Sequence, residues 1–136
     1  MNDIPQPGSY ALRSKATGYV VVGWLSDEPA YTVGARNWNE WPTDQRWRFE
    51  GTDFGCYRLV HDVTGRVLDS DENRQVYIST PNDGSFQKWR MNPGGEGDWC
   101  LQNLATGFAL DGNADRDVYT MEPNDGAYQR WQFIPV

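Results

Sequence analysis

The chain has 136 residues, of which 38% are hydrophobic and 23% charged, and its formal net charge at pH 7 is −7. This length and composition fit one folded domain with a single core. No basic surface is available to neutralise phosphates, and no apolar run approaches the roughly 20 residues of a membrane helix. We therefore expect neither nucleic-acid binding nor direct membrane insertion.

The N-terminal stretch "MNDIPQPGSY" has no basic segment followed by an apolar one, so the sequence shows no secretory signal. Two cysteines, Cys56 and Cys100, are too few for a disulfide framework and lack metal-ligand spacing. We interpret them as free thiols in a reducing compartment. The predicted location is the cytoplasm, or outside the cell by secretion without a classical signal peptide.

An internal repeat organises the chain. A shift of 106 − 64 = 42 residues superimposes residues 64–89 on residues 106–131 without a gap. The matching residues are Thr64, Gly65, Leu68, Asp69, Arg74, Val76, Tyr77, Pro81, Asn82, Asp83, Gly84, Gln87 and Trp89. The predicted domain therefore spans residues 1–136, with repeats of about 40 residues over 8–53, 54–96 and 97–136.

The first repeat is looser than the other two and carries five extra residues. When Tyr31 is matched to Tyr77, four of the five follow Tyr31, around the stretch "NWNEW" at residues 37–41. The first repeat therefore has a longer loop there, with two additional tryptophans, Trp38 and Trp41.

Short segments of alternating polarity fill each repeat. The stretches "CYRLVH" and "QVYIS" alternate with period two, which predicts strands. Thr-Gly and Asn-Asp-Gly between them predict turns, and no window keeps a helical pattern for three turns. The predicted fold class is all-β. Closing three four-stranded units into one barrel removes exposed sheet edges, which predicts a β-trefoil with three pseudo-threefold repeats.

Each repeat ends in glutamine, any residue, tryptophan: Gln45-Arg46-Trp47, Gln87-Lys88-Trp89 and Gln129-Arg130-Trp131. These triplets resemble the QxW repeats of ricin B-chain-like (R-type) lectins, and the resemblance runs from Tyr10 to Phe133. It implies that the tryptophans are core residues and that the glutamines brace a turn or the edge of a site.

The resemblance also implies sugar pockets. In this family an aspartate accepts hydrogen bonds from two vicinal hydroxyls, and an aromatic ring stacks on the sugar. By position the aspartates are Asp69 and Asp111, each after a leucine, whereas the first repeat has Val22. We therefore expect competent pockets in the second and third repeats and a lost or altered one in the first. The alternative for each aspartate is a turn former that holds its own loop.

The positions where the family usually has its stacking ring hold Ser79 and Met121. Either the pockets are dead, or other aromatic residues supply the ring; we favour the second. Asn82 and Asn124 are candidates for amide hydrogen bonds or for a turn role. The predicted sugar-binding residues are Asp69, Tyr77, Asn82, Phe86, Gln87, Asp111, Tyr119, Asn124, Tyr128 and Gln129.

Secreted members of the family often carry a disulfide within each repeat. The corresponding positions here are Val67 with Pro81 and Ala109 with Pro123, so this bridge is absent. Its absence agrees with the predicted location.

Three other interpretations compete. A catalytic triad or zinc site would depend on His61, the single histidine, and we expect no enzyme and no cofactor. The spacing of a calcium-binding loop is partly matched by Asp111, Asn113, Asp115 and Glu122, but Arg116 stands where that loop requires glycine. The third interpretation is a protease inhibitor or another protein-binding module that uses the Trp38 and Trp41 loop. The same loop would equally suit a sugar platform in place of the lost first pocket, or a hydrophobic lid over the barrel.

The resemblance favours a lectin for glycans that end in galactose or N-acetylgalactosamine. A homodimer is a further possibility that the sequence leaves open.

Overall fold

The computed structural model describes residues 4–24, 31–38, 42–53, 55–95 and 97–136. These residues form an all-β structure, with 12 strands and two short 3-10 turns among them. The strands are β1 (Gly8–Ser14), β2 (Val20–Trp24), β3 (Tyr31–Arg36), β4 (Trp47–Gly51), β5 (Tyr57–His61), β6 (Val67–Ser70), β7 (Val76–Ser79), β8 (Trp89–Pro93), β9 (Trp99–Asn103), β10 (Ala109–Gly112), β11 (Val118–Met121) and β12 (Trp131–Pro135).

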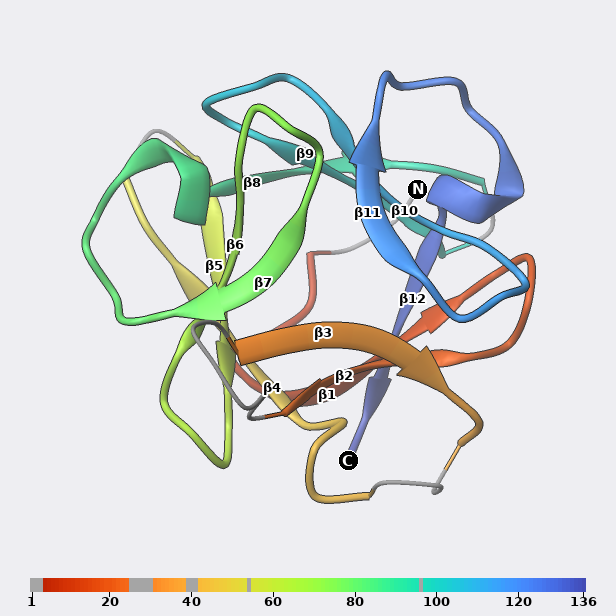
Figure 1. Ribbon diagram of the computed structural model, residues 1–136, viewed down its shortest axis with the longest axis horizontal. Helices are drawn as coiled ribbons and strands as arrows, with labels where there is room; N and C mark the ends of the chain where they lie inside the picture. The colour runs from red at the N-terminus through yellow and green to blue at the C-terminus, as the bar shows by residue number, and fades with distance from the viewer. Residues whose placement is uncertain (1–3, 25–30, 39–41, 54, 96) are drawn as a thin grey trace.

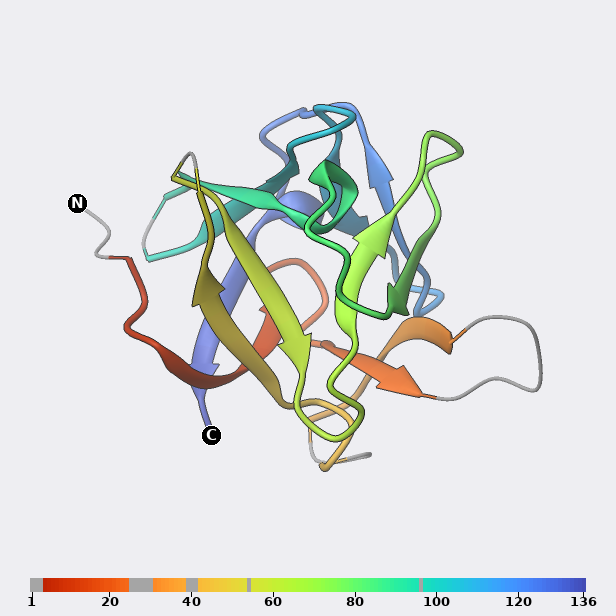
Figure 2. The same cartoon turned by 90° about the vertical axis from the view of Figure 1, so that its left-hand side faces the viewer.

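Strands β1, β4, β5, β8, β9 and β12 form a closed antiparallel barrel, because each pairs with the next and β12 pairs with β1. Closure removes the open edges on which other chains could add a strand. The barrel strands lie at the left of Figure 2, and the remaining strands lie at its right.

The other six strands form three hairpins, β2–β3, β6–β7 and β10–β11, arranged around the centre of the molecule (Figure 1). They join one another through Tyr31 with Ile78, Gly34 with Asp117, and Gln75 with Tyr119. Two barrel strands and one hairpin per repeat, used three times, make a β-trefoil. The prediction of an all-β trefoil is confirmed.

The three QxW tryptophans begin barrel strands and are buried, with 0%, 0% and 1% of Trp47, Trp89 and Trp131 exposed. Each indole Nε1 donates to a hairpin carbonyl oxygen of its own repeat, on Val21, Leu68 and Leu110, at 3.0, 3.1 and 2.9 Å. A buried indole needs a partner for its single donor. These bonds therefore satisfy the ring and tie each hairpin to the barrel.

Two 3-10 turns that the sequence pattern did not predict, Ser85–Gln87 and Ala127–Gln129, come just before β8 and β12. Each follows an Asn-Asp-Gly turn whose aspartate, Asp83 or Asp125, has a left-handed backbone with φ of 58°. Aspartate tolerates this region better than most residues. The glutamine at the end of each 3-10 turn is buried and bonds to the hairpin aspartate of its repeat.

Candidate functional site

Asp69 lies on β6, and only 7% of it is exposed. Its Oδ1 accepts a hydrogen bond from the Ser70 backbone N–H at 2.8 Å, and its Oδ2 accepts one from Gln87 Nε2 at 3.0 Å. A carboxylate has about four lone-pair sites, so about two remain for a ligand. The two bonds also fix the orientation of the carboxylate.

Gln87 acts behind Asp69 and is itself 2% exposed. Its Nε2 also donates to the Thr80 carbonyl oxygen at 3.0 Å, and its Oε1 accepts from the Asn82 backbone N–H at 2.9 Å. Both amide protons of the side chain are thus used. Gln87 connects the carboxylate to the loop at residues 80–82.

A cavity of about 220 Å³ opens above this network. It is smaller than the roughly 300–1,000 Å³ pockets that enclose drug-sized ligands, which suits a single sugar ring. Its walls are formed by Asp69, Ser70, Asp71, Tyr77, Asn82, Gly84 and Phe86. Asp69, Tyr77, Asn82 and Phe86 were predicted from the sequence as site residues; Gln87 braces the cavity from behind.

Two aromatic residues border the cavity in different ways. Phe86 is 36% exposed. The Tyr77 hydroxyl donates to the Ser70 carbonyl oxygen at 3.4 Å. Burial, together with the Asp69 and Asp71 carboxylates, raises the pKa of Tyr77 to about 12, so at neutral pH its hydroxyl keeps its proton.

The third repeat reproduces the bonding network. Asp111 Oδ1 accepts from the Gly112 N–H at 2.7 Å, and its Oδ2 accepts from Gln129 Nε2 at 3.0 Å. Gln129 also bonds to the Asn124 N–H at 2.9 Å and to the Glu122 carbonyl oxygen at 2.9 Å. The two repeats therefore hold their aspartates in the same way.

The third repeat differs from the second at its aromatic and charged groups. Tyr128, in the place of Phe86, is 47% exposed. Burial raises the pKa of Asp111, although the bonds from Gln129 and Gly112 oppose that effect. The Tyr119 hydroxyl donates weakly to the Gly112 carbonyl oxygen at 3.5 Å, and burial raises the pKa of Tyr119.

Both asparagines of the Asn-Asp-Gly turns have a local role. Asn82 Oδ1 accepts from the Gly84 N–H at 2.7 Å, and Asn124 Oδ1 accepts from the Gly126 N–H at 2.8 Å. Side-chain bonds of this kind stabilise turns. Asn82 also lines the cavity, so its turn role does not remove it from the site.

A family model described as "Ricin-type beta-trefoil lectin domain-like" matches residues 43–121, more than half of the chain. The chain belongs to this family. The resemblance that the QxW triplets suggested is thereby confirmed. A search of curated protein sequences gives no match.

Solved structures share the fold of this lectin-like domain. The designed threefold-symmetric protein ThreeFoil superimposes with a TM-score of 0.85 at 23% identity, over 95% of this chain and 99% of that one. SeviL, bound to the asialo-GM1 saccharide, gives 0.80 at 18% identity, over 96% and 99%. The exo-beta-1,3-galactanase from Clostridium thermocellum gives 0.84 at 22%, over 98% of this chain but only 31% of the enzyme. At these identities the likeness shows the fold alone.

The first repeat of the lectin-like domain lacks the carboxylate. Val22 is fully buried, and the next N–H, that of Gly23, donates to the Asp44 carbonyl oxygen at 3.1 Å. A Cβ at Gly23 would lie 3.2–3.3 Å from Ile78 and His61. The space beside β2 at this point is therefore filled by protein.

His61 is a buried structural residue of the lectin-like domain. Its Nε2 lies 2.9 Å from the Asp44 carbonyl oxygen, which can only accept, so Nε2 carries the proton and Nδ1 accepts from Thr64 Oγ1 at 2.9 Å. Burial lowers the pKa of His61, which keeps it neutral. Asn103, its equivalent in the next repeat, likewise donates to the Phe86 carbonyl oxygen at 2.9 Å.

The Asp-rich loop of the third repeat is an asparagine-capped turn. Asn113 Oδ1 accepts from the N–H groups of Asp115 and Asp117 at 2.9 and 3.1 Å. Across the described parts of the chain, no group of three or more His, Cys, Asp or Glu side chains is placed to hold a metal ion. No helix in those parts is long and apolar enough to span a membrane.

Sequence reasoning missed Ser70, Asp71 and Gly84 as walls of the cavity. Each is next to, or within two residues of, a predicted site residue. Their contribution depends on the path of the backbone around the cavity, for which the sequence gives no separate signal.

Proposed function

We propose that the protein is a lectin that binds glycans ending in galactose or N-acetylgalactosamine through the Asp69 and Asp111 pockets, without catalysis. The observation that carries the proposal is the repeated glutamine–aspartate brace, at 3.0 Å in both repeats. It orients a carboxylate and leaves about two of its lone-pair sites unused.

The chemistry suits adjacent hydroxyl groups. Two oxygens of one carboxylate accept from two neighbouring hydroxyls, and hydrogen bonds to a charged acceptor are the stronger ones. Phe86 and Tyr128 are exposed, and they would cover the C–H face of the sugar. Tyr77, Tyr119, Asn82 and Asn124 would complete the walls. Gln87 and Gln129 would position the aspartates.

The galactose preference rests on the family. Two structural neighbours carry names that refer to galactose-containing substrates, the exo-beta-1,3-galactanase and a GlcNAcα1-4Gal-releasing endo-β-galactosidase from Clostridium perfringens. The chain covers 31% and 33% of these enzymes, so it corresponds to one part of each.

A shallow pocket of this kind should bind a monosaccharide at around millimolar, or about 4 kcal/mol. Two pockets on different repeats, or a homodimer, would raise the strength of binding to clustered glycans. Cys56 and Cys100 do not form a disulfide, which supports residence in the cytoplasm or export by a route that avoids oxidation.

A glycan array tests the proposal. The wild-type protein should bind glycans with terminal galactose or N-acetylgalactosamine, and the double variant Asp69→Asn with Asp111→Asn should lose that signal. A matched control, Asp83→Asn with Asp115→Asn, changes the same number of charges outside the two carboxylate networks and should keep it. Equal array profiles for the two double variants would contradict the assignment of the pockets.

A protein-binding role remains the second candidate because Trp38 is 41% exposed. Exposed tryptophans are frequent centres of protein interfaces. Trp41, the other tryptophan of the loop, lies outside the described residues. Inhibition of a panel of proteases by the wild-type protein, and its loss in Trp38→Ser, would favour this candidate over the lectin.

A further inference from the structure

A second kind of hollow lies where the second and third repeats meet. It is separate from the Asp69 cavity, and one of its walls is Gln129, whose side chain also braces Asp111. It has a volume of about 350 Å³ and lies between the β8–β9 hairpin and the loop that carries Asp125. Its walls are formed by Asn92, Pro93, Gly94, Gly95, Cys100, Pro123, Asp125, Gly126, Gln129 and Arg130. We call it the Arg130 groove.

A hollow of about 410 Å³ lies at the equivalent place where the first and second repeats meet, and we call it the Lys88 groove. Its walls are Gly51, Thr52, Asp53, Arg58, Asp83 and Lys88, and a shift of 42 residues turns each of them into a wall of the Arg130 groove. The two grooves therefore provide an internal comparison on one scaffold.

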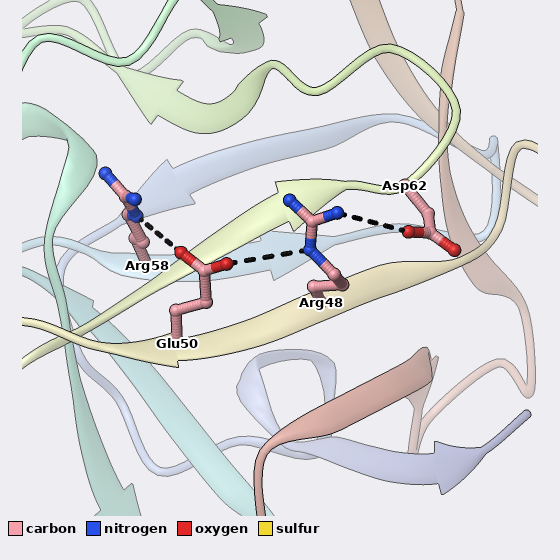
Figure 3. Close-up of polar contacts among 4 residues, drawn as sticks. All are labelled: Arg48, Glu50, Arg58 and Asp62. Carbon is pink, nitrogen blue, oxygen red and sulfur yellow. Dashed lines mark hydrogen bonds and ion pairs between the residues drawn. The ribbon is translucent and has the colours of Figure 1, made fainter.

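The cations of the Lys88 groove are already paired. Lys88 Nζ lies 2.8 Å from Asp53 Oδ1. Arg58 Nε lies 2.9 Å from Glu50 Oε1, in the row of ion pairs that Arg48 extends along β4 and β5 (Figure 3). An incoming ligand would have to break an ion pair to use either cation.

Substitutions between the repeats remove this pairing from the Arg130 groove. Gly95 stands in the place of Asp53, and Cys100 in the place of Arg58. Among the described residues Arg130 forms no ion pair, and its side-chain bond there is from Nη2 to the Asp125 carbonyl oxygen at 3.2 Å. A guanidinium has five N–H donors, so most of its donors are available to a ligand.

The Arg130 groove also contains a carboxylate. Asp125 lines it together with Arg130 and Cys100. The pKa of Cys100 is raised mainly by burial, and Asp125 raises it further while Arg130 lowers it. A strongly anionic ligand would face Asp125, and a cationic one would face Arg130. A neutral ligand rich in hydroxyl groups would find a donor and an acceptor together.

From this geometry we propose that the Arg130 groove is an additional carbohydrate-binding site, for one uncharged sugar ring, separate from the Asp69 and Asp111 pockets. Its location follows from the cavity and its unpaired charges; the choice of a sugar over another neutral polyol rests on the proposed function. The hydroxyls would accept from Arg130 and donate to Asp125. The prolines Pro93 and Pro123 would supply apolar contact at the walls.

The variant Gly95→Asp tests this proposal by restoring the acid that the Lys88 groove has. A Cβ at Gly95 would lie 3.1 Å from Arg130 Nη1 and 3.9 Å from Lys15 Nζ, so the new carboxylate would reach Arg130. The backbone of Gly95 is not left-handed, so aspartate fits there once the end of the flexible Arg130 side chain moves by a few tenths of an ångström. The control, Lys88→Gln, alters the equivalent cation of the other groove.

The experiment is an NMR titration of the backbone amides with galactose, methyl glucoside and methyl mannoside. In the wild type at least one of these sugars should shift the amides of Gly94, Gly95 and Cys100, and Lys88→Gln should preserve the response. Gly95→Asp should weaken it at least tenfold while the amides of Ser70 and Gly112 still report the carboxylate pockets. Arg130→Gln should give the same loss without adding a charge.

Two results would overturn the proposal. One is the absence of any shift at the three groove amides with all three sugars. The other is a groove response that Gly95→Asp and Arg130→Gln leave unchanged. Failure of the lectin proposal itself would be seen elsewhere, as silence at Ser70 and Gly112, because different amides report the two kinds of site.

Discussion

The first and second repeats share the same core, a buried tryptophan bonded to the hairpin, and differ in the residue at the position of Asp69. Trp47 and Trp89 are both fully buried and bond to their hairpins in the same way. In the second repeat, Gln87 donates a hydrogen bond to the carboxylate of Asp69. In the first repeat, the position of Asp69 is taken by Val22, which is fully buried. The buried tryptophan and its bond to the hairpin are therefore common to both repeats, whereas the bond between glutamine and carboxylate belongs to the second repeat of the two.

The backbone hydrogen bonds of the two repeats also differ at the residue after the Asp69 position. The N–H of Ser70 points to the Asp69 carboxylate, whereas the N–H of Gly23 points to the Asp44 carbonyl oxygen. The first repeat thus satisfies internally the donor that the other repeats use to orient an acid. Loss of the acid in the first repeat is accompanied by a rearranged hydrogen bond and a filled space.

The largest loss of stability should come from replacing the buried tryptophans that the two repeats share. Trp47→Ala and Trp89→Ala should each lower the free energy of unfolding by about 3–5 kcal/mol, because each removes a fully buried indole and its hydrogen bond. Chemical denaturation measures this. A cost at Trp47 far below the cost at Trp89 would show that the first repeat is not held by the same core layer.

An intermediate effect on stability is expected from the glutamine that orients the carboxylate. Gln87→Ala leaves Asp69, Thr80 and Asn82 without their shared partner and should cost about 1–3 kcal/mol of stability. It should also weaken sugar binding at that pocket, because the carboxylate loses its fixed orientation.

The matched control for that variant is Gln45→Ala in the first repeat, where no carboxylate occupies the equivalent place. It should destabilise the protein without changing sugar binding. Unchanged sugar affinity in Gln87→Ala would mean that the brace has no part in the site.

The β-trefoil fold was predictable from the sequence because its sequence pattern is repeated. Three QxW triplets in register indicated the trefoil, and the Leu-Asp pairs indicated Asp69 and Asp111 as the acids. The hydrogen bond from Gln87 to Asp69 was not predicted, since the two residues are 18 positions apart and meet only through the 3-10 turn at Ser85–Gln87.

The Arg130 groove was not predicted either. It depends on which loops the barrel brings side by side, and on Gly95, which stands in the place of Asp53 and leaves Arg130 without that acid. His61 was considered for catalysis, and its bond to the Asp44 carbonyl oxygen became visible only in three dimensions.

A smaller effect concerns pH in the third repeat. Burial raises the pKa of Asp111 above its ordinary value of 3.8. Folding therefore favours its protonated form, and this group's contribution to stability is complete below the ordinary pKa and is lost as pH rises through the raised one.

Sugar binding should move the other way, since a protonated acid accepts less well. As pH falls, sugar affinity at the third-repeat pocket should begin to weaken before pH 3.8 is reached, because the pKa of Asp111 is raised. Below that raised pKa, affinity should fall by up to about tenfold per pH unit. Titrations at several pH values, with the Gly112 amide as reporter, measure this. Constant affinity down to pH 3.8 would contradict a role for the ionised carboxylate.

The smallest effect should be a gain. Ser70 Oγ is buried and has no hydrogen-bond partner among the residues that the structure describes, and the third repeat has Gly112 in its place. Ser70→Ala should raise the free energy of unfolding by about 1 kcal/mol, because an unsatisfied buried hydroxyl is removed. Sugar binding should persist, since the backbone N–H that orients Asp69 remains. A loss of stability would show that the hydroxyl has a partner, such as a bound water molecule.

The central claim is that two carboxylates, held alike in the second and third repeats, are the galactose sites of this lectin-like domain. Site-resolved NMR titration with galactose tests it most directly, because the Ser70 and Gly112 amides bond to Asp69 and Asp111. Galactose should shift both amides, Asp69→Asn should abolish the shift at Ser70 alone, and Asp111→Asn the shift at Gly112 alone. Galactose-induced shifts at both amides that survive both substitutions, or no shift at either in the wild type, would contradict the claim.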